Sequence, residues 1–178
     1  MRRKTILHLD FEIDKLTNSI ENSLTGEIFE TAILELSNKD VSTIKKAEWQ
    51  FNLRSELRNS EHTVYKLTTI HNPTIIHGLI SLSDKRDHIF IHLLESASIN
   101  KGRNKLYTGV AGNLVAFASK CSFERGYQGI VAFVAKSNLI EHYKTSLGAK
   151  RFSGNGMFID TRDSYRLVRQ YFKNFDNG

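Results

Sequence analysis

Two glycines stand three residues apart in the stretch YTGVAGNLVAFASK, at Gly109 and Gly112, just before a pattern typical of an amphipathic helix. A glycine within a helix costs about 1 kcal/mol relative to alanine, so two at a helix start need a physical reason. They let an anion approach the backbone N–H groups that the first helical turn leaves unpaired. Lys101, Arg103 and Lys105 precede the pair and add positive charge. The stretch is a candidate phosphate cradle, with close packing of a helix on a sheet as the alternative.

The composition indicates a globular protein with a substantial core. The chain has 178 residues, of which 40% are hydrophobic and 25% charged, and its net charge is +6. We expect one domain over residues 1–178, and the single cysteine, Cys121, fits a reducing compartment. Acidic and basic residues alternate without a recognised module, which disfavours nucleic acid as a partner. No apolar run is long enough for a membrane span, so the expected location is the cytoplasm.

The N-terminal third predicts two helices and the first strands. Residues 11–22 carry apolar side chains at helical spacing and follow Asp10, a suitable N-cap. Residues 31–36 have the composition of a short strand, and a second helix is expected to begin at Asp40. The alternation of apolar and polar residues over 50–57 favours another strand.

The next segment predicts an antiparallel meander. Residues 63–70 are rich in β-branched side chains, which favour strands. Residues 75–83 and 88–96 have the pattern of two strands, and the polar turn DKRD joins them into a hairpin. Three successive strands linked by short turns form a meander.

The apolar period changes from two to 3.6 residues after Gly109, which predicts a helix to about Arg125. Residues 129–135 form a nearly continuous apolar run, typical of a strand buried on both faces. A helix over 138–147, a hairpin split by the turn SGNG, and a last helix capped by Thr161 complete the chain. The order predicts an α+β fold with a mixed sheet and a helical crossover between two parallel strands.

Three motifs follow one another in a specific order after residue 105. LYTGVA resembles a pyrophosphate-binding loop, although Leu106 stands where such a loop usually has Gln or Arg. SFERGYQGIVAFVAK has the end of a helix, a glycine and a buried strand, and NLIEHYKTSLG then supplies Asn138, Tyr143 and a closing Leu-Gly. Together these motifs resemble the GNAT superfamily of acyl-coenzyme A-dependent N-acyltransferases over roughly residues 60–160.

The resemblance implies an acyl-CoA N-acyltransferase fold, a mostly antiparallel sheet with a central parallel strand pair and flanking helices. Strands near 88–95 and 129–135 would run parallel and splay apart at their carboxyl ends. The implied organisation has acceptor-side helices and first strands in residues 1–60. It has an acetyl-CoA-binding core over 61–160 and a C-terminal helix over 161–178.

The resemblance also implies acetyl-CoA as the acyl donor, and no spacing of His, Cys, Asp or Glu residues suggests a metal. The pantetheine arm would pair with the end of the fourth strand, and loop amides would hold the pyrophosphate. The implied cofactor-binding residues are Leu94, Glu95, Ser96, Tyr107, Thr108, Gly109, Val110, Ala111, Gly112, Asn113 and Asn138.

The implied reaction is direct attack of a primary amine on the acetyl thioester. Tyr143 would protonate the leaving thiolate, with a packed aromatic side chain as the alternative. Glu95 is the candidate base and His92 the second candidate. Strand alternation places these two side chains on opposite faces, so we expect only one of them to line the site.

Two other functions stay open, as do some of the partners. Leu106 in the loop motivates a non-catalytic acyl-CoA-binding or regulatory module on the same scaffold, and the charge of +6 motivates a nucleic-acid-binding protein. The expected partners are acetyl-CoA and an amine acceptor. Neither the identity of that amine nor the formation of a homodimer follows from the sequence.

Overall fold

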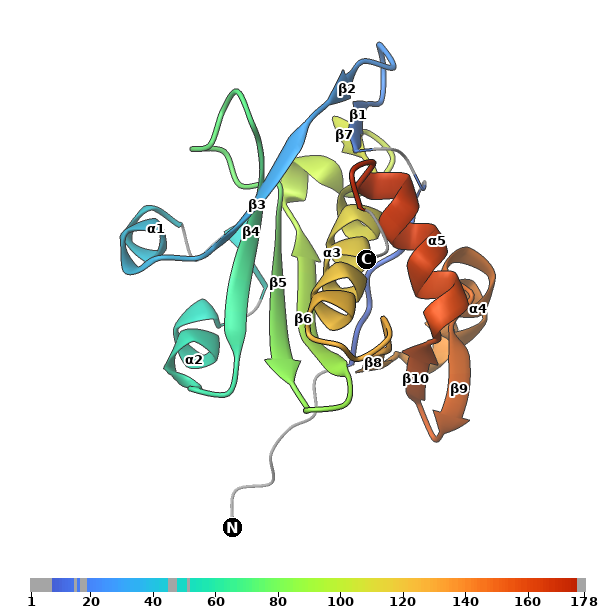
Figure 1. Ribbon diagram of the computed structural model, residues 1–178. Coiled ribbons are helices and arrows are strands. Elements are labelled where there is room, and N and C mark those ends of the chain that lie inside the picture. The colour runs from blue at the N-terminus through green and yellow to red at the C-terminus, as the bar shows by residue number, and fades with distance from the viewer. Residues whose placement is uncertain (1–7, 15, 17–18, 45–47, 51, 176–178) are drawn as a thin grey trace.

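The computed structural model describes residues 8–14, 16, 19–44, 48–50 and 52–175, and its centre is a twisted mixed sheet (Figure 1). In spatial order the strands of this sheet are β3 (Thr31–Glu35), β4 (Thr63–Thr69), β5 (Gly78–Asp84), β6 (Ile89–Ser96), β8 (Val131–Val134), β10 (Gly156–Ile159) and β9 (Lys150–Ser153). A small second sheet has the order β2 (Ile28–Phe29), β1 (Ile20–Asn22) and β7 (Tyr107–Thr108).

Helices cover both faces of the large sheet. They are α1 (Asn38–Thr43), α2 (Leu53–Arg58), α3 (Val110–Glu124), α4 (Ile140–Leu147) and α5 (Thr161–Tyr171), with short 3₁₀ turns η2 (Ser98–Asn100) and η3 (Ser137–Leu139). In Figure 1, α1 and α2 lie beside the β3–β4 edge, whereas α3 crosses the centre of the sheet and α5 packs on α3. The larger hydrophobic core lies between the sheet and α3, and a smaller one around Leu53 and Leu79 lies on the other face.

The predicted meander and crossover are confirmed. Strands β3, β4, β5 and β6 pair antiparallel in succession. Strand β8 runs parallel to β6 through the pairs Ile89–Val131 and Phe90–Ala132, and α3 connects the two strands. Because β6 continues to Ser96 beyond this short ladder, the two strands part at their carboxyl ends, as expected.

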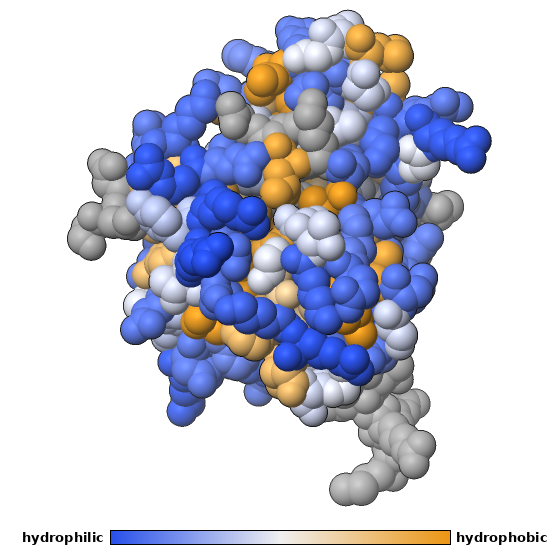
Figure 2. Space-filling model, turned by 90° about the vertical axis from the view of Figure 1, so that its right-hand side faces the viewer, coloured by the Kyte–Doolittle hydropathy of each residue, from blue (hydrophilic) through white to orange (hydrophobic). Residues whose placement is uncertain are grey.

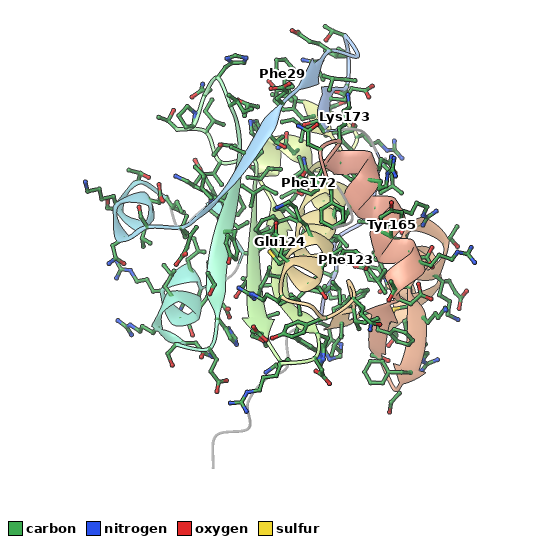
Figure 3. The ribbon with its side chains drawn as sticks, in the orientation of Figure 1. Phe29, Phe123, Glu124, Tyr165, Phe172 and Lys173 are labelled. Atoms are coloured by element: carbon green, nitrogen blue, oxygen red, sulfur yellow. The ribbon has the colours of Figure 1, made fainter. Side chains whose placement is uncertain are left out.

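Helix α3 begins and ends at glycines, as the sequence predicts. Gly109 is its N-cap with a φ of 89°, and Gly126 follows its end with a φ of 82°, both in the left-handed region that glycine adopts without a steric cost. The helix packs against α5, where the rings of Phe123 and Tyr165 meet edge to face at 6.4 Å (Figure 3).

The predicted helix over residues 11–22 is wrong for the described residues. Residues 8–14 form no helix, Leu9 makes an isolated bridge with Ala135, and β1 follows at Ile20. Leu9 and Ile13 are buried while the residues between them are more exposed, which is the alternation of a strand. The backbone here bonds to distant parts of the chain, and these contacts outweigh the helical spacing of the apolar residues.

The elements between residues 37 and 58 also differ from the prediction. Residues 50–57 were expected to form a strand, but α2 begins at Leu53 because the side chain of Asn52 accepts a hydrogen bond from the Ser55 N–H. Helix α1 begins before Asp40, which instead completes a capping box with Ser37. The helix ends at Thr43, and residues 45–47 lie outside the described part of the chain.

The predicted last hairpin and closing helix are confirmed, with a shift of one residue at the cap. Strands β9 and β10 pair antiparallel, and Asp160 rather than Thr161 caps α5.

Figure 2 shows the α4–α5 side as largely hydrophilic, with hydrophobic side chains gathered over the β1–β2 hairpin. Across the described residues, the helices are too short or too polar to cross a membrane.

We predict that Gly112→Ala destabilises the fold by about 1–3 kcal/mol, the usual cost of overpacking. A Cβ at this position would lie 2.3 Å from the Tyr171 hydroxyl of α5. Urea unfolding measures the effect, and the double variant Gly112→Ala/Tyr171→Phe should recover part of it because the nearest atom is removed. An unchanged midpoint for Gly112→Ala would contradict this packing role.

Candidate functional site

A cavity of about 620 Å³ opens at the carboxyl end of β6. One wall is the strand from His92 to Ser96, and the opposite wall is the N-terminal segment, which we define as residues 8–14. Lys101 and Lys105, from the loop before α3, complete the wall together with Gln50, Ala111 and Lys136. The cavity therefore lies where β6 and β8 separate.

The N-terminal segment enters this gap beside β8. The Leu9 N–H donates to the Val134 carbonyl at 2.7 Å, and the Lys136 N–H donates to the Leu9 carbonyl at 3.0 Å. Leu9 thus forms a parallel bridge with Ala135. The backbone of the segment takes the place beside β8 that β6 vacates when the two strands part.

The same segment also contacts α4. Tyr143 is fully buried, and its hydroxyl donates to the Phe11 carbonyl at 2.6 Å. The neighbouring His142 accepts the Ile13 N–H through Nε2 at 2.8 Å. Burial, with a smaller contribution from the charges of Asp10 and Glu12, raises the pKa of Tyr143 far above its usual value, so its hydroxyl stays protonated.

The N-terminus of α3 holds an anion that belongs to the chain itself. The Gly109 N–H donates to Asp14 Oδ1 at 3.1 Å, and Lys105 Nζ lies 3.1 Å from Asp14 Oδ2. A carboxylate in this position is stabilised by the helix dipole as well as by the two donors. The position that the sequence identifies as a phosphate cradle therefore has the chemistry to hold an anion.

Glu95 is buried in the wall of the cavity and is already hydrogen-bonded. Its Oε1 accepts the Gln50 N–H at 2.8 Å, and Lys101 Nζ lies 3.1 Å from the same oxygen. Lys101 is partly exposed, while the Glu95 side chain is only 6% exposed. The Glu95 carboxylate is thus held by partners within the chain at the wall of the cavity.

A bulge in β6 brings His92 into the same cavity as Glu95. The pairing with β5 shifts so that Ser81 opposes Leu93 and Leu82 opposes Ile91, which leaves His92 as the extra residue. Ile91 and Leu94, three residues apart, consequently both face the core beneath α3. The expectation that His92 and Glu95 point to opposite faces is wrong, because the bulge reverses the alternation and both line the cavity.

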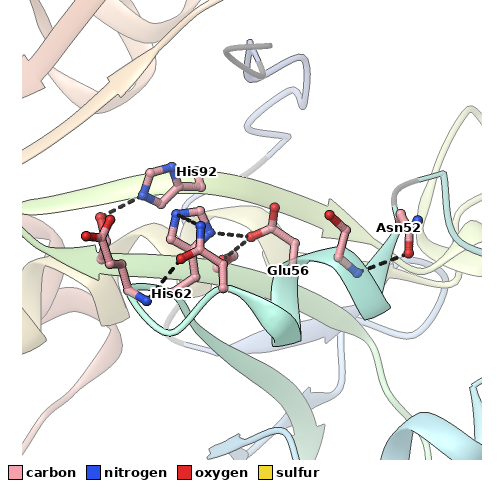
Figure 4. A network of polar contacts seen from close by, with 9 residues as sticks. Asn52, Glu56, His62 and His92 are labelled. Carbon is pink, nitrogen blue, oxygen red and sulfur yellow. Dashed lines mark hydrogen bonds and ion pairs between the residues drawn. The ribbon is translucent and has the colours of Figure 1, made fainter. Parts of the chain in front are cut away.

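His92 belongs to a polar network on the α2 side of the sheet (Figure 4). Its ring stacks on His62 at 3.7 Å, and its Nε2 lies 2.6 Å from Ser83 Oγ. Glu56 of α2 holds His62 at 2.8 Å and accepts the Ser81 hydroxyl at 2.7 Å. Burial, helped by His62, lowers the pKa of His92 to about 4, so its imidazole is neutral at pH 7.

The residues expected to bind the cofactor fall into two groups. The residues that line the cavity are Leu94, Glu95, Ser96 and Ala111. The others are held by neighbouring elements: Tyr107 and Thr108 pair with β1, Val110 lies in the core, Gly112 abuts Tyr171, Asn113 donates to Thr31, and Asn138 is exposed in η3. Gly109 and Tyr143 do not line the cavity, but each donates a hydrogen bond to the N-terminal segment that forms one of its walls.

Sequence reasoning missed most of one wall. The N-terminal segment carries alternating apolar residues, Leu9, Phe11 and Ile13, which is a strand signal that a helical interpretation obscured. The basic cluster before Gly109 was identified, and two of its members, Lys101 and Lys105, do line the cavity. Gln50 carried no recognisable signal, because it contributes only its backbone N–H to Glu95.

Comparison with solved structures identifies the fold. The chain is 18% identical to AtaTR bound with AcCoA, with a TM-score of 0.54 over 78% of this chain and 98% of that chain. It is 12% identical to a chimera of the spermidine N-acetyltransferase SpeG from Vibrio cholerae and hSSAT, with a TM-score of 0.53 over 76% and 99% of the respective chains. No family model and no curated protein matches the sequence. The fold is that of the GNAT superfamily.

We predict that the buried, neutral His92 makes the protein less stable in acid. Because its folded-state pKa of about 4 lies below the unfolded value of 6.5, the unfolded chain takes up the proton first. Stability from this group is complete well above pH 6.5 and is lost progressively on acidification toward pH 4. Urea unfolding across this range should show a shallower loss for His92→Gln than for wild type. Equal slopes for His92→Gln and wild type would contradict the assignment.

Proposed function

We propose that this protein is an N-acetyltransferase that transfers the acetyl group of acetyl-CoA to a primary amine. The observation that carries the proposal is the parting of β6 and β8 beside Gly109, which leaves a cavity between a strand edge and a helix N-terminus. Such a gap suits a long cofactor with an amide-rich arm and an anionic end. The GNAT fold of AtaTR bound with AcCoA supports the same assignment.

Each end of acetyl-CoA has a candidate partner. The pyrophosphate would bind the first amides of α3, where Gly109 allows close approach and Lys105 supplies charge. The pantetheine amides would pair with the backbone of Leu94 to Ser96, in the manner of an added strand. The acetyl group would then lie near Glu95 and the buried end of the cavity.

The proposed chemistry conserves protons. The amine nitrogen attacks the thioester carbon, the carbon–sulfur bond breaks, and the base takes one amine proton while the acid gives one to the thiolate. Tyr143 is the proposed acid, and it can act only after its hydroxyl leaves the Phe11 carbonyl. Glu95 is the proposed base, with His92 as the second candidate, since both line the cavity.

One observation favours a second function, a non-catalytic acyl-CoA-binding module. Both candidate catalytic groups make hydrogen bonds within the chain, Tyr143 to Phe11 and Glu95 to Gln50. Calorimetry with acetyl-CoA tests binding, and release of free thiol in the presence of a panel of amines tests catalysis. Binding without thiol release against any amine would favour the binding module, and absence of binding would contradict both functions.

We predict that Gly109→Val lowers the affinity for acetyl-CoA at least tenfold, because a branched side chain would stand where the pyrophosphate approaches. The change also strains a left-handed backbone position, so it needs a control with the same strain. Gly126→Val provides it, since Gly126 is also left-handed and an added Cβ there would meet no atom within 4 Å. Calorimetry on both folded variants makes the comparison. Equal affinities would show that Gly109 is needed only for its left-handed backbone conformation and not for the approach of the cofactor.

We predict that Tyr143→Phe lowers turnover by roughly 10²-fold, the usual loss of a general acid. Affinity for acetyl-CoA should change by no more than a few-fold, because the proposed binding groups are the first amides of α3, Lys105 and the β6 backbone rather than the Tyr143 hydroxyl. The thiol-release assay measures turnover, and Tyr127→Phe is the control, since Tyr127 donates its hydroxyl to Asp84 outside the cavity. Near-normal turnover in Tyr143→Phe would contradict the role of Tyr143 as the acid and would show that its ring only packs in the core.

A further inference from the structure

The N-terminal segment makes the contacts that the proposed function assigns to acetyl-CoA. The Asp14 carboxylate occupies the anion position at the N-terminus of α3, where it meets both Gly109 and Lys105. The Phe11 carbonyl accepts the hydrogen bond that the Tyr143 hydroxyl donates. Both interactions would have to break before a pyrophosphate and a thiolate could take the same partners.

The backbone of the segment also lies in the gap where the pantetheine arm is proposed to bind, although the segment bonds to the β8 side and the arm would pair with β6. Leu9 adds a short extended stretch to β8 through two main-chain hydrogen bonds. The other wall of the same gap is the end of β6, from His92 to Ser96. An extended chain with amide groups thus already lies between the diverging strands.

We propose that residues 9–14 are a built-in competitor of acetyl-CoA, with Asp14 in place of the pyrophosphate and the Phe11 carbonyl in place of the thiolate. This inference rests on the proposed function. The cofactor binds when the segment leaves the gap, so the measured dissociation constant is the intrinsic one divided by the fraction of molecules in which the segment is displaced. Displacement also frees Tyr143.

The contacts of the segment suit a reversible competitor. Leu9 and Ile13 are its buried apolar anchors, whereas Asp10 and Glu12 are exposed. Farther along the chain, the Leu16 carbonyl accepts a hydrogen bond from Gln170 of α5 at 2.6 Å, and β1 begins at Ile20. The segment can therefore leave the gap while Leu16 and β1 keep it tethered, so it competes as an intramolecular ligand at high effective concentration.

Two single-residue variants of the chain test the competition by calorimetry with acetyl-CoA. Asp14→Asn removes the charge from the cradle, and Leu9→Ala removes an apolar anchor without changing any charge. We expect each to tighten binding about tenfold relative to wild type. Asp87→Asn is the matched control, because it removes the same charge from an exposed turn and should leave the affinity unchanged.

Amide hydrogen exchange on the wild-type chain tests displacement directly. The N–H groups of Leu9, Ile13 and Lys136 are hydrogen-bonded through the segment, so acetyl-CoA should accelerate their exchange. This measurement separates true displacement from simple repulsion, because a carboxylate that only repels the pyrophosphate would leave the exchange of Leu9 unchanged.

The outcomes distinguish the two proposals. Binding that is equally tight in wild type, Asp14→Asn and Leu9→Ala, with unchanged or slower exchange at Leu9, would overturn the competitor and leave the acetyltransferase proposal intact. Tighter binding in both variants with faster exchange would support the competitor. Failure of acetyl-CoA to bind wild type and both variants would overturn the proposed function and the competitor together.

Discussion

The separation of β6 and β8 is the constraint on which the rest of the site depends. Their parallel ladder consists of Ile89–Val131 and Phe90–Ala132, after which β6 continues alone toward Ser96. Two parallel strands that part expose backbone donors and acceptors in the middle of a sheet, and such groups must find partners. On the β8 side the N-terminal segment supplies them, and on the β6 side the cavity remains.

The bulge in β6 is the second consequence of strand geometry. One extra residue at His92 turns both His92 and Glu95 toward the cavity while Ile91 and Leu94 stay in the core. Around this wall, charge is balanced locally, since Lys101 meets Glu95 and Lys105 meets Asp14. A cofactor with a pyrophosphate group would replace the Asp14 carboxylate with its phosphates, so Lys105 would keep an anionic partner in either state.

Much of the fold could be predicted from residues 63–171, because each element there has a local signal. Gly109 and Gly126 mark the two ends of α3, and the apolar run before Ala135 predicts a buried strand. The helical crossover predicts that this strand runs parallel to the strand before the helix. The region before residue 60 was predicted poorly for a physical reason. Its short elements depend on single capping bonds, such as Asn52 to Ser55, or on bonds to distant residues.

The sequence by itself determined that a helix begins after Gly109, since a left-handed backbone there follows from local chemistry. It also predicted an anion at the unpaired amides of that terminus. It also determined which strand carries Glu95. Only the tertiary structure decided that His92 shares the cavity with Glu95, because a one-residue shift in strand register has no local signature. Likewise, only the tertiary structure brought Asp14 to Gly109 and Phe11 to Tyr143, because contacts between residues so far apart in sequence arise from how the strands part and not from any residue pattern.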